Sequence, residues 1–281
     1  MKGNQILMFL IFAFLTGFSY QNIFDKKLIN INSQELNRNN LTNASFILEK
    51  SNLDVYQNFL NNMVNIEGGS LAMGCEKNYC DIDEKPLHNV KLRSFQMSKY
   101  EVTQAQWGAV MGTNPSYNKG CDSCPVENVS WNDIKRFLSE INKQTGKRFR
   151  LPTEAEWEFA AKGGSNSLGY FYSGSNYIQN VAWYGDENSK MRTQVVGQLA
   201  PNELGLYDMT GNVREWCSDW YGENYYRSSP KSNPRGPGSG LFRVVRGGSM
   251  YHGFFGYRVT SRLWENPGNR SRFIGFRLAY D

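Results

Sequence analysis

The feature that most constrains the fold is the way Gly, Asn and Pro interrupt the second half of the chain. After Gly163, short apolar segments alternate with these residues, and none keeps a helical period for long. The sequence contains 27 Gly, and 14% of its residues are aromatic. This pattern favours a loop-rich fold of short strands over a helical bundle. It also excludes a disordered chain, because disordered chains are poor in aromatic residues.

Two main helices precede this region. Between Ile134 and Ile141, apolar residues recur at intervals of three and four, as one buried helical face requires. Ser130 is a favoured N-cap for this helix, and Gly146 ends it. A second helix begins at the capping box formed by Thr153 and Glu156.

Strand patterns surround these helices. Residues 64–66 alternate between apolar and polar, and His88–Met97 is predicted to form one strand for the same reason. Thr103 opens a short helix that ends before the turn at Asn114. Together these segments predict an α+β fold in which two main helices pack on short, mainly antiparallel strands.

The N-terminus is typical of an exported bacterial protein. One positive charge precedes the ten apolar residues Ile6–Leu15, which are too few to span a bilayer comfortably. Small residues at Gly17 and Ser19 then suit a signal peptidase. We predict a signal peptide over residues 1–20 and a secreted or periplasmic location in the cell envelope. An uncleaved N-terminal anchor is the alternative.

The mature chain is expected to have two parts. Residues 21–62 form an Asn-rich spacer, and residues 63–281 form the folded domain. The mean hydropathy of −0.57 excludes a protein with several membrane spans, so no transmembrane domain is expected after signal removal. The net charge of +5 is spread along the chain without a polybasic run, so we expect no nucleic-acid partner.

Five cysteines fit an oxidising compartment. Cys75, Cys80, Cys121 and Cys124 are expected to form two disulfides, whose pairing the sequence leaves open. Cys217 is then a leftover buried thiol. The alternatives are a zinc site built from the first four thiolates and a redox-active pair at Cys121 and Cys124.

Eight short strings occur in a distinctive order along the chain. They are Glu84–His88, Lys99–Thr103, Pro125–Trp131, Arg150–Glu158, Asn202–Met209, Gly211–Trp216, Arg246–Ser249 and Gly275–Leu278. In this order they resemble the sulfatase-modifying-factor family, whose founder is the formylglycine-generating enzyme. The likeness runs from about Met63 to Tyr280. It implies a formylglycine-generating-enzyme-like variant of the C-type-lectin-like fold.

The resemblance implies a copper site that this chain lacks. Formylglycine-generating enzymes oxidise a sulfatase cysteine with oxygen and a copper ion held by two thiolates, which are soft ligands suited to Cu(I). These two positions fall here on His252 and on Tyr257 or Gly256. No cysteine follows Cys217. We therefore expect neither copper nor formylglycine-generating activity.

Of two further positions near that site, one matches the family and the other does not. Ser249 is retained, whereas Arg214 stands where the family has a tryptophan. An arginine cannot rebuild an apolar wall, although its planar head can bind an anion. His252 alone, without a second histidine or a carboxylate nearby, makes a poor site for another metal.

The resemblance also implies calcium. One family site carries over to Asp208, Gly211, Val213 and Glu215, whose hard oxygen ligands on a tight loop suit Ca²⁺. The alternative is a hydrogen-bonded turn in which Glu215 caps backbone donors. A second family site would begin at Asn180 and Val181, but the loop that should complete it does not match cleanly.

The C-terminal segment is rich in arginine. Arg258 and Arg262 are candidates for an anion-binding cleft. The alternative is that the guanidinium groups join loops through hydrogen bonds to carbonyls. We therefore expect a non-catalytic binding or structural protein of the cell envelope whose partner is a protein, peptide or glycan. An oxidase with an altered active site is the second hypothesis.

Overall fold

The computed structural model describes residues 57–185, 190–251 and 254–281, without the side chains of Phe254 and Phe255. The predicted signal peptide and residues 21–56 of the predicted spacer lie outside this range. Residues Phe59–Asp281 form one unit with its own core. No helix in the described ranges is both long and apolar enough to cross a membrane.

Capping boxes start the α-helices, as their sequences require. The described part of the chain contains α3 (Gln104–Met111), α4 (Trp131–Thr145) and α5 (Glu154–Ala161). The side chains of Thr103, Ser130 and Thr153 accept the backbone N–H three residues on in each case. The predicted caps at Ser130 and Thr153 are therefore confirmed. Gly146 ends α4 in a left-handed conformation with a φ of 66°, as predicted.

Nine short strands form three sheets in the described residues. The strands are β1 (Met63–Ile66), β2 (Ser70–Met73), β3 (His88–Lys91), β4 (Phe95–Ser98), β5 (Arg214–Trp220), β6 (Arg243–Arg246), β7 (Leu263–Glu265), β8 (Ile274–Gly275) and β9 (Ala279–Tyr280). The sheet orders are β1-β4-β9, β2-β3 and β7-β6-β5-β8. Within these sheets, all strand pairs are antiparallel except β5 with β8, so the predicted mainly antiparallel α+β fold is confirmed.

Single turns of 3₁₀ helix fill some of the loops between these elements. They are η2 (Ile82–Glu84), η3 (Gly164–Asn166), η4 (Ile178–Asn180), η5 (Tyr225–Arg227) and η6 (Phe254–Tyr257). The rest of the second half is irregular, as the interrupted sequence predicts.

The predicted single strand over His88–Met97 is wrong. This segment is divided between β3 and β4, which belong to different sheets. At the break, the Leu92 N–H donates to Gly69 O at 2.8 Å, and a side chain at Gly68 would collide with the Leu92 carbonyl. The break is visible in the sequence as a shift in the alternation of apolar residues. The buried residues have even numbers at Val90 and Leu92 but odd numbers at Phe95 and Met97.

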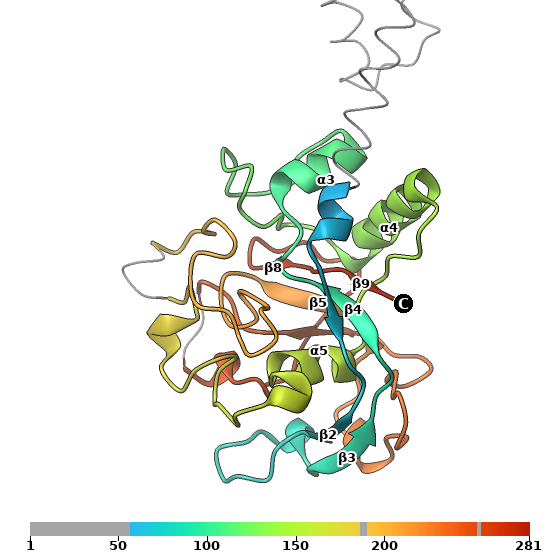
Figure 1. The fold of residues 1–281 in the computed structure, drawn as a ribbon, viewed down its shortest axis with the longest axis vertical. Helices are drawn as coiled ribbons and strands as arrows, with labels where there is room; N and C mark the ends of the chain where they lie inside the picture. The colour runs from blue at the N-terminus through green and yellow to red at the C-terminus, as the bar shows by residue number, and fades with distance from the viewer. Residues whose placement is uncertain (1–56, 186–189, 252–253) are drawn as a thin grey trace, which may run out of the picture. The chain divides into compact units, whose positions relative to one another are not determined.

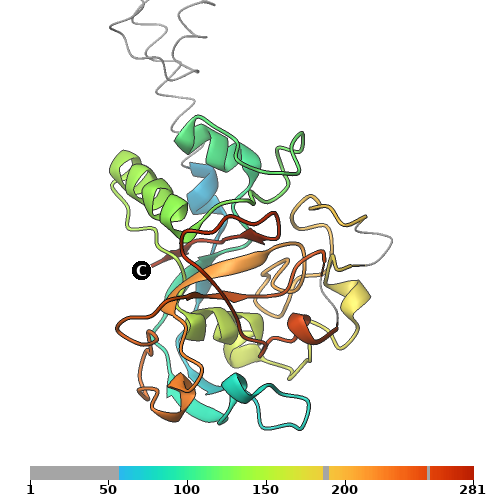
Figure 2. The same ribbon diagram turned by 180° about the vertical axis from the view of Figure 1, so that it is seen from behind.

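Helix α5 lies in the centre of this unit. All eight of its residues are buried, and it packs against β2, β5 and β6 (Figures 1 and 2). Helices α3 and α4 pack on each other, with Trp107 stacked on Phe137 at 5.1 Å between ring centroids. Phe59 packs against Phe137 as well, so the core includes residues that precede Met63.

Buried ion pairs join the loops of the second half to this core. Each consists of one arginine and one glutamate that are both almost fully buried: Arg246 with Glu158, Arg258 with Glu84, Arg262 with Glu154, and Arg277 with Glu215. Three of the guanidinium groups also donate to loop carbonyls, for example Arg262 to Asp83 O at 2.7 Å. Loop carbonyls that have no hydrogen-bond donor from a neighbouring strand thereby accept one from an arginine.

Candidate functional site

A tight turn before β5 is the centre of the site that the resemblance indicates. Asp208, Gly211 and Asn212 all have positive φ, at 56°, 87° and 52°. A side chain at Gly211 would collide with the Trp183 carbonyl, so glycine is needed for this close approach. The Gly211 N–H donates to Gly247 O at 2.8 Å, which ties the turn to the Gly-Gly-Ser segment.

Glu215, at the end of this turn, is bound by side chains. Arg277 donates to both of its oxygens at 2.7 Å, and the Trp157 indole N–H donates to Oε2 at 2.7 Å. Arg277 also donates to Tyr207 O at 2.8 Å, so it links β5 to the preceding loop. Among its described contacts, Glu215 therefore accepts side-chain N–H groups, and it is Glu101 that caps the backbone, accepting the Val213 N–H at 3.1 Å.

Three buried acids share one buried base in this cluster. Glu101, Asp208 and Glu215 surround Arg277. Burial, followed by the charges of Asp208 and Glu215, raises the pKa of Glu101. Burial also raises the pKa of Asp208 to about 6, although its carboxylate accepts the Gly197 N–H at 2.7 Å. The cluster thus holds more negative charge than Arg277 offsets.

Ca²⁺ prefers oxygen ligands, but both carboxylate oxygens of Glu215 already accept N–H groups from Arg277 and Trp157. The residues that would hold it are those that the resemblance implies: Glu215 through its carboxylate, and Asp208, Gly211 and Val213 through their carbonyls. Such an ion would share Glu215 with Arg277. The implied second set is less complete, because the Asn180 carbonyl accepts the Ala200 N–H at 3.0 Å and residues 186–189 lie outside the described chain.

The Gly-Gly-Ser segment is packed against Tyr257. A side chain at Gly248 would collide with the Tyr257 ring, and the Tyr257 hydroxyl donates to Ser249 O at 2.7 Å. Tyr257 and Ser249 are both buried. Tyr257, one of the two candidates for the second implied thiolate position, is therefore a phenol in a hydrogen bond. The first position, His252, lies outside the described residues.

Arg214 is half-buried on β5, directly before Glu215. Burial lowers the pKa of its guanidinium, and the charge of Glu265 opposes part of this shift. The position that carries tryptophan in the family thus holds a partly desolvated cation in this protein.

A ladder of stacked planar groups lies beside this segment on the surface. We call it the aromatic ladder, and its members are Tyr117, Arg272, Phe273 and Tyr251. The Arg272 guanidinium lies 5.0 Å from the Tyr117 centroid and 4.8 Å from the Phe273 centroid. Phe273 stacks on Tyr251 at 5.0 Å with an interplanar angle of 17°. Tyr117 and Tyr251 remain 65% and 51% exposed, so the ladder presents open ring surface.

The two arginines that we weighed for an anion-binding cleft lie inside the protein. Arg258 donates to both oxygens of Glu84 at 2.7 and 2.5 Å, and Arg262 does the same to Glu154 at 2.7 and 2.9 Å. Arg258 is 1% exposed. The prediction that they form an anion-binding cleft is therefore wrong. Both arginines neutralise buried carboxylates, and their N–H groups do not face solvent.

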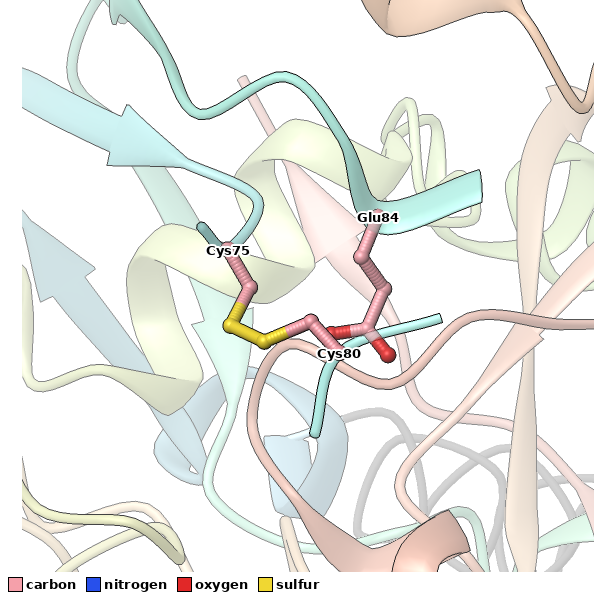
Figure 3. A group of neighbouring side chains, drawn as sticks. All are labelled: Cys75, Cys80 and Glu84. Atoms are coloured by element: carbon pink, nitrogen blue, oxygen red, sulfur yellow. A yellow bond between two sulfur atoms is a disulfide. The ribbon is translucent and has the colours of Figure 1, made fainter. Parts of the chain in front are cut away.

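The cysteines form two local disulfides. Cys75 pairs with Cys80, and Cys121 pairs with Cys124. Glu84 lies beside the first disulfide, and its carbonyl accepts the Cys75 N–H at 3.0 Å (Figure 3). The predicted pair of disulfides is confirmed, with each bond between the two nearer cysteines. Cys217 is free and buried, and burial raises the pKa of its thiol.

The carboxylates that organise this region were not predicted from the sequence. Glu101 holds Val213, and Glu84, Glu154 and Glu158 hold the buried arginines. Each of these acids lies in one of the eight strings that carry the resemblance. Their position within these strings could have marked them as important. The strings do not show, however, which distant arginine each acid binds.

Comparisons with known proteins bear on the family and the fold. A family model described as the sulfatase-modifying factor enzyme 1-like domain matches residues 51–281. Chaperone protein LppX of Paenibacillus barcinonensis is 38% identical over 235 residues, covering 66% of this chain and 77% of LppX. The formylglycine-generating enzyme of Streptomyces coelicolor is 32% identical over 285 residues, covering 78% of this chain and 88% of the enzyme. The solved structure of Treponema denticola variable protein 1 matches with a TM-score of 0.69 and 34% identity, covering 78% of this chain and 94% of that one.

Proposed function

This chain belongs to the sulfatase-modifying factor enzyme 1-like family, and we propose that it is an exported binding protein without formylglycine-generating activity. The formylglycine-generating-enzyme-like α+β fold expected from the resemblance is confirmed. Function in such a fold depends on the surface loops and the site rather than on the scaffold. The proposal therefore rests on what this chain's own residues do at those places.

The observation that carries the proposal is the contact of Tyr257 with Ser249. Neither candidate for the second thiolate position, Tyr257 or Gly256, carries sulfur, and the Tyr257 phenol is held in a hydrogen bond to a backbone carbonyl. The one free thiol of the chain, Cys217, is buried in the core cluster. A buried thiol with a raised pKa supplies little thiolate for copper or for chemistry.

The aromatic ladder supports a binding role. Exposed tyrosines, a phenylalanine and an arginine stacked in one row are the side chains that dominate the energetics of protein interfaces. The rings are held by their neighbours before any partner arrives, which lowers the entropic cost of binding. A relative of this chain is named as a chaperone protein, which favours a protein over a glycan as the partner.

Site-specific photo-crosslinking tests the binding role. A photoreactive residue at Tyr251 or Tyr117 should give a discrete covalent adduct with one envelope protein in the cells that produce this chain. Tyr177 is the matched control, because it is 66% exposed and lies outside the ladder. Arg272→Glu should reduce the adduct at Tyr251. Equal labelling at Tyr177, or no discrete adduct at either ladder position, would contradict the proposal.

The alternative is an oxidase of the formylglycine-generating type with an altered site, supported by its enzyme relatives. Incubation with a Cys-x-Pro-x-Arg peptide and oxygen, with and without copper, distinguishes the two. We expect no aldehyde above the level of a protein-free control. Copper-dependent aldehyde would favour the oxidase.

We also propose calcium at the turn that ends in Glu215. The surplus negative charge of the acid cluster supports it, because a divalent cation would offset the repulsion among Glu101, Asp208 and Glu215. Calorimetric titration of chelator-treated protein should show one Ca²⁺ per chain and a higher unfolding temperature. Mg²⁺ is the control ion, since it demands a tighter octahedral shell. No heat and no stabilisation with millimolar Ca²⁺ would contradict the site.

A further inference from the structure

We propose that an open pocket between α4, the start of α5 and Asp281 binds a small monocarboxylate with an apolar body. The pocket has a volume of 310 Å³, and none of its lining residues belongs to the Glu215 turn or the aromatic ladder. This volume lies at the lower end of the range for small-molecule sites, about 300–1,000 Å³. The pocket is therefore a second surface, independent of the proposed function.

One wall of the pocket is apolar and rigid. Leu92, Leu138 and Leu151 line it together with Trp131. The Trp131 indole N–H donates to Cys217 O at 3.1 Å, and the Arg243 guanidinium lies 3.8 Å from the ring centroid. The indole is thus fixed by two contacts, and the Lys135 ammonium also lies 5.6 Å from its ring centroid.

The charged lining carries an excess of cations. Its two acids, Glu156 and Asp281, are both bound by Arg150, at 2.7 and 2.6 Å at closest approach. Lys135 and Arg235 also line the pocket, are exposed and form no ion pair with any described residue. Together with Arg93 and Arg150, they bring the lining to four basic and two acidic side chains.

This balance selects the class of ligand. The excess of cations in the lining attracts an anion, while the carboxylates of Glu156 and Asp281 would repel a group with two or more negative charges. The apolar wall adds a preference for an aromatic or branched aliphatic body. Both a free carboxylic acid and the C-terminal residue of a peptide present this chemistry.

Calorimetric titration of the purified protein with three probes tests the inference. N-acetyl-phenylalanine carries the charge, its amide lacks it, and 3-phenylpropionate carries it without a peptide group. We expect both acids to bind in about the millimolar range and the amide to bind at least about tenfold more weakly. Tighter binding of the acetylated amino acid would indicate a peptide C-terminus as the natural ligand, and equal binding would indicate a free acid.

Charge reversal on the rim provides the matched test. Lys135→Glu combined with Arg235→Glu changes two exposed side chains and should weaken N-acetyl-phenylalanine binding by about tenfold or more. Lys143→Glu combined with Lys147→Glu makes the same change in net charge on exposed residues outside the pocket, and should alter affinity by less than about twofold. Equal losses in the two double variants, or equal binding of acid and amide, would overturn the proposal.

Discussion

At the residue scale, buried guanidinium groups supply hydrogen-bond donors to backbone carbonyls, as neighbouring strands do in a regular sheet. Arg246, Arg258, Arg262 and Arg277 each meet a buried glutamate, and three of them also donate to loop carbonyls. A loop-rich core has many carbonyls without a ladder partner, and leaving them unpaired would be costly. The paired glutamate offsets the cost of burying the positive charge.

Removing one partner of such a pair should be strongly destabilising. Arg258→Leu leaves Glu84 buried and uncompensated, and should lower the free energy of unfolding by about 3–5 kcal/mol. Arg93→Leu is the control, because its pair with Asp281 is 51% and 48% exposed and should cost less than about 1 kcal/mol. Urea unfolding measures both. Similar losses for the two variants would show that burial does not set the strength of these pairs.

Asp219 should make stability depend on pH. Burial, followed by the charge of Glu154, raises its pKa from 3.8 to about 7. Between these values the folded protein keeps a proton that the unfolded chain releases, so stability falls as pH rises, by up to about 1.4 kcal/mol per pH unit. Asp208, with a pKa of about 6, adds a slope of the same sign at lower pH.

Unfolding free energies at pH 5 and pH 7 measure this effect. Asp219→Asn should flatten the fall in stability between the two values. The acids with lowered pKa, such as Asp133 and Asp281, titrate below this window and do not mask it. Identical pH slopes for the variant and the wild-type protein would contradict the assignment.

At the scale of elements, local chemistry sets the helices and long-range packing sets the strands. The caps at Ser130 and Thr153 were predictable because a cap involves residues three apart. The division of His88–Met97 was not, because it depends on the approach of Gly68 to Leu92 from another segment. The partner of Glu215 was equally hidden, since Arg277 lies 62 residues away. The sequence strings located the site, but the contacts inside it come from the fold.

The end of α4 offers a test of an element boundary. Gly146 has a φ of 66° and would meet nothing within 4 Å if it gained a side chain. Gly146→Ala should therefore cost about 1 kcal/mol of stability through backbone strain alone. Gly146→Asn should cost less, because Asn tolerates the left-handed region. Thermal unfolding compares the two, and an equal loss for both would contradict a strain-only origin.

At the scale of the whole molecule, the family's fold is kept, and we propose that the copper ligands of its enzymes are replaced. The fold, the Gly-Gly-Ser segment and the acid cluster around Glu215 are all present. Tyr257, one of the two candidates for the second thiolate position, is buried and hydrogen-bonded, and the free Cys217 is also buried. The surface nearby carries the aromatic ladder, which suits recognition rather than oxidation.

The most direct test is titration of the disulfide-intact protein with Cu(I) against a chromophoric chelator. The formylglycine-generating enzyme relative from Streptomyces coelicolor serves as the positive control. We expect this chain to leave the copper with the chelator, because soft ligands are missing from the two positions that hold it in the family. One tightly held equivalent of Cu(I), released by Tyr257→Phe or His252→Ala, would contradict the account.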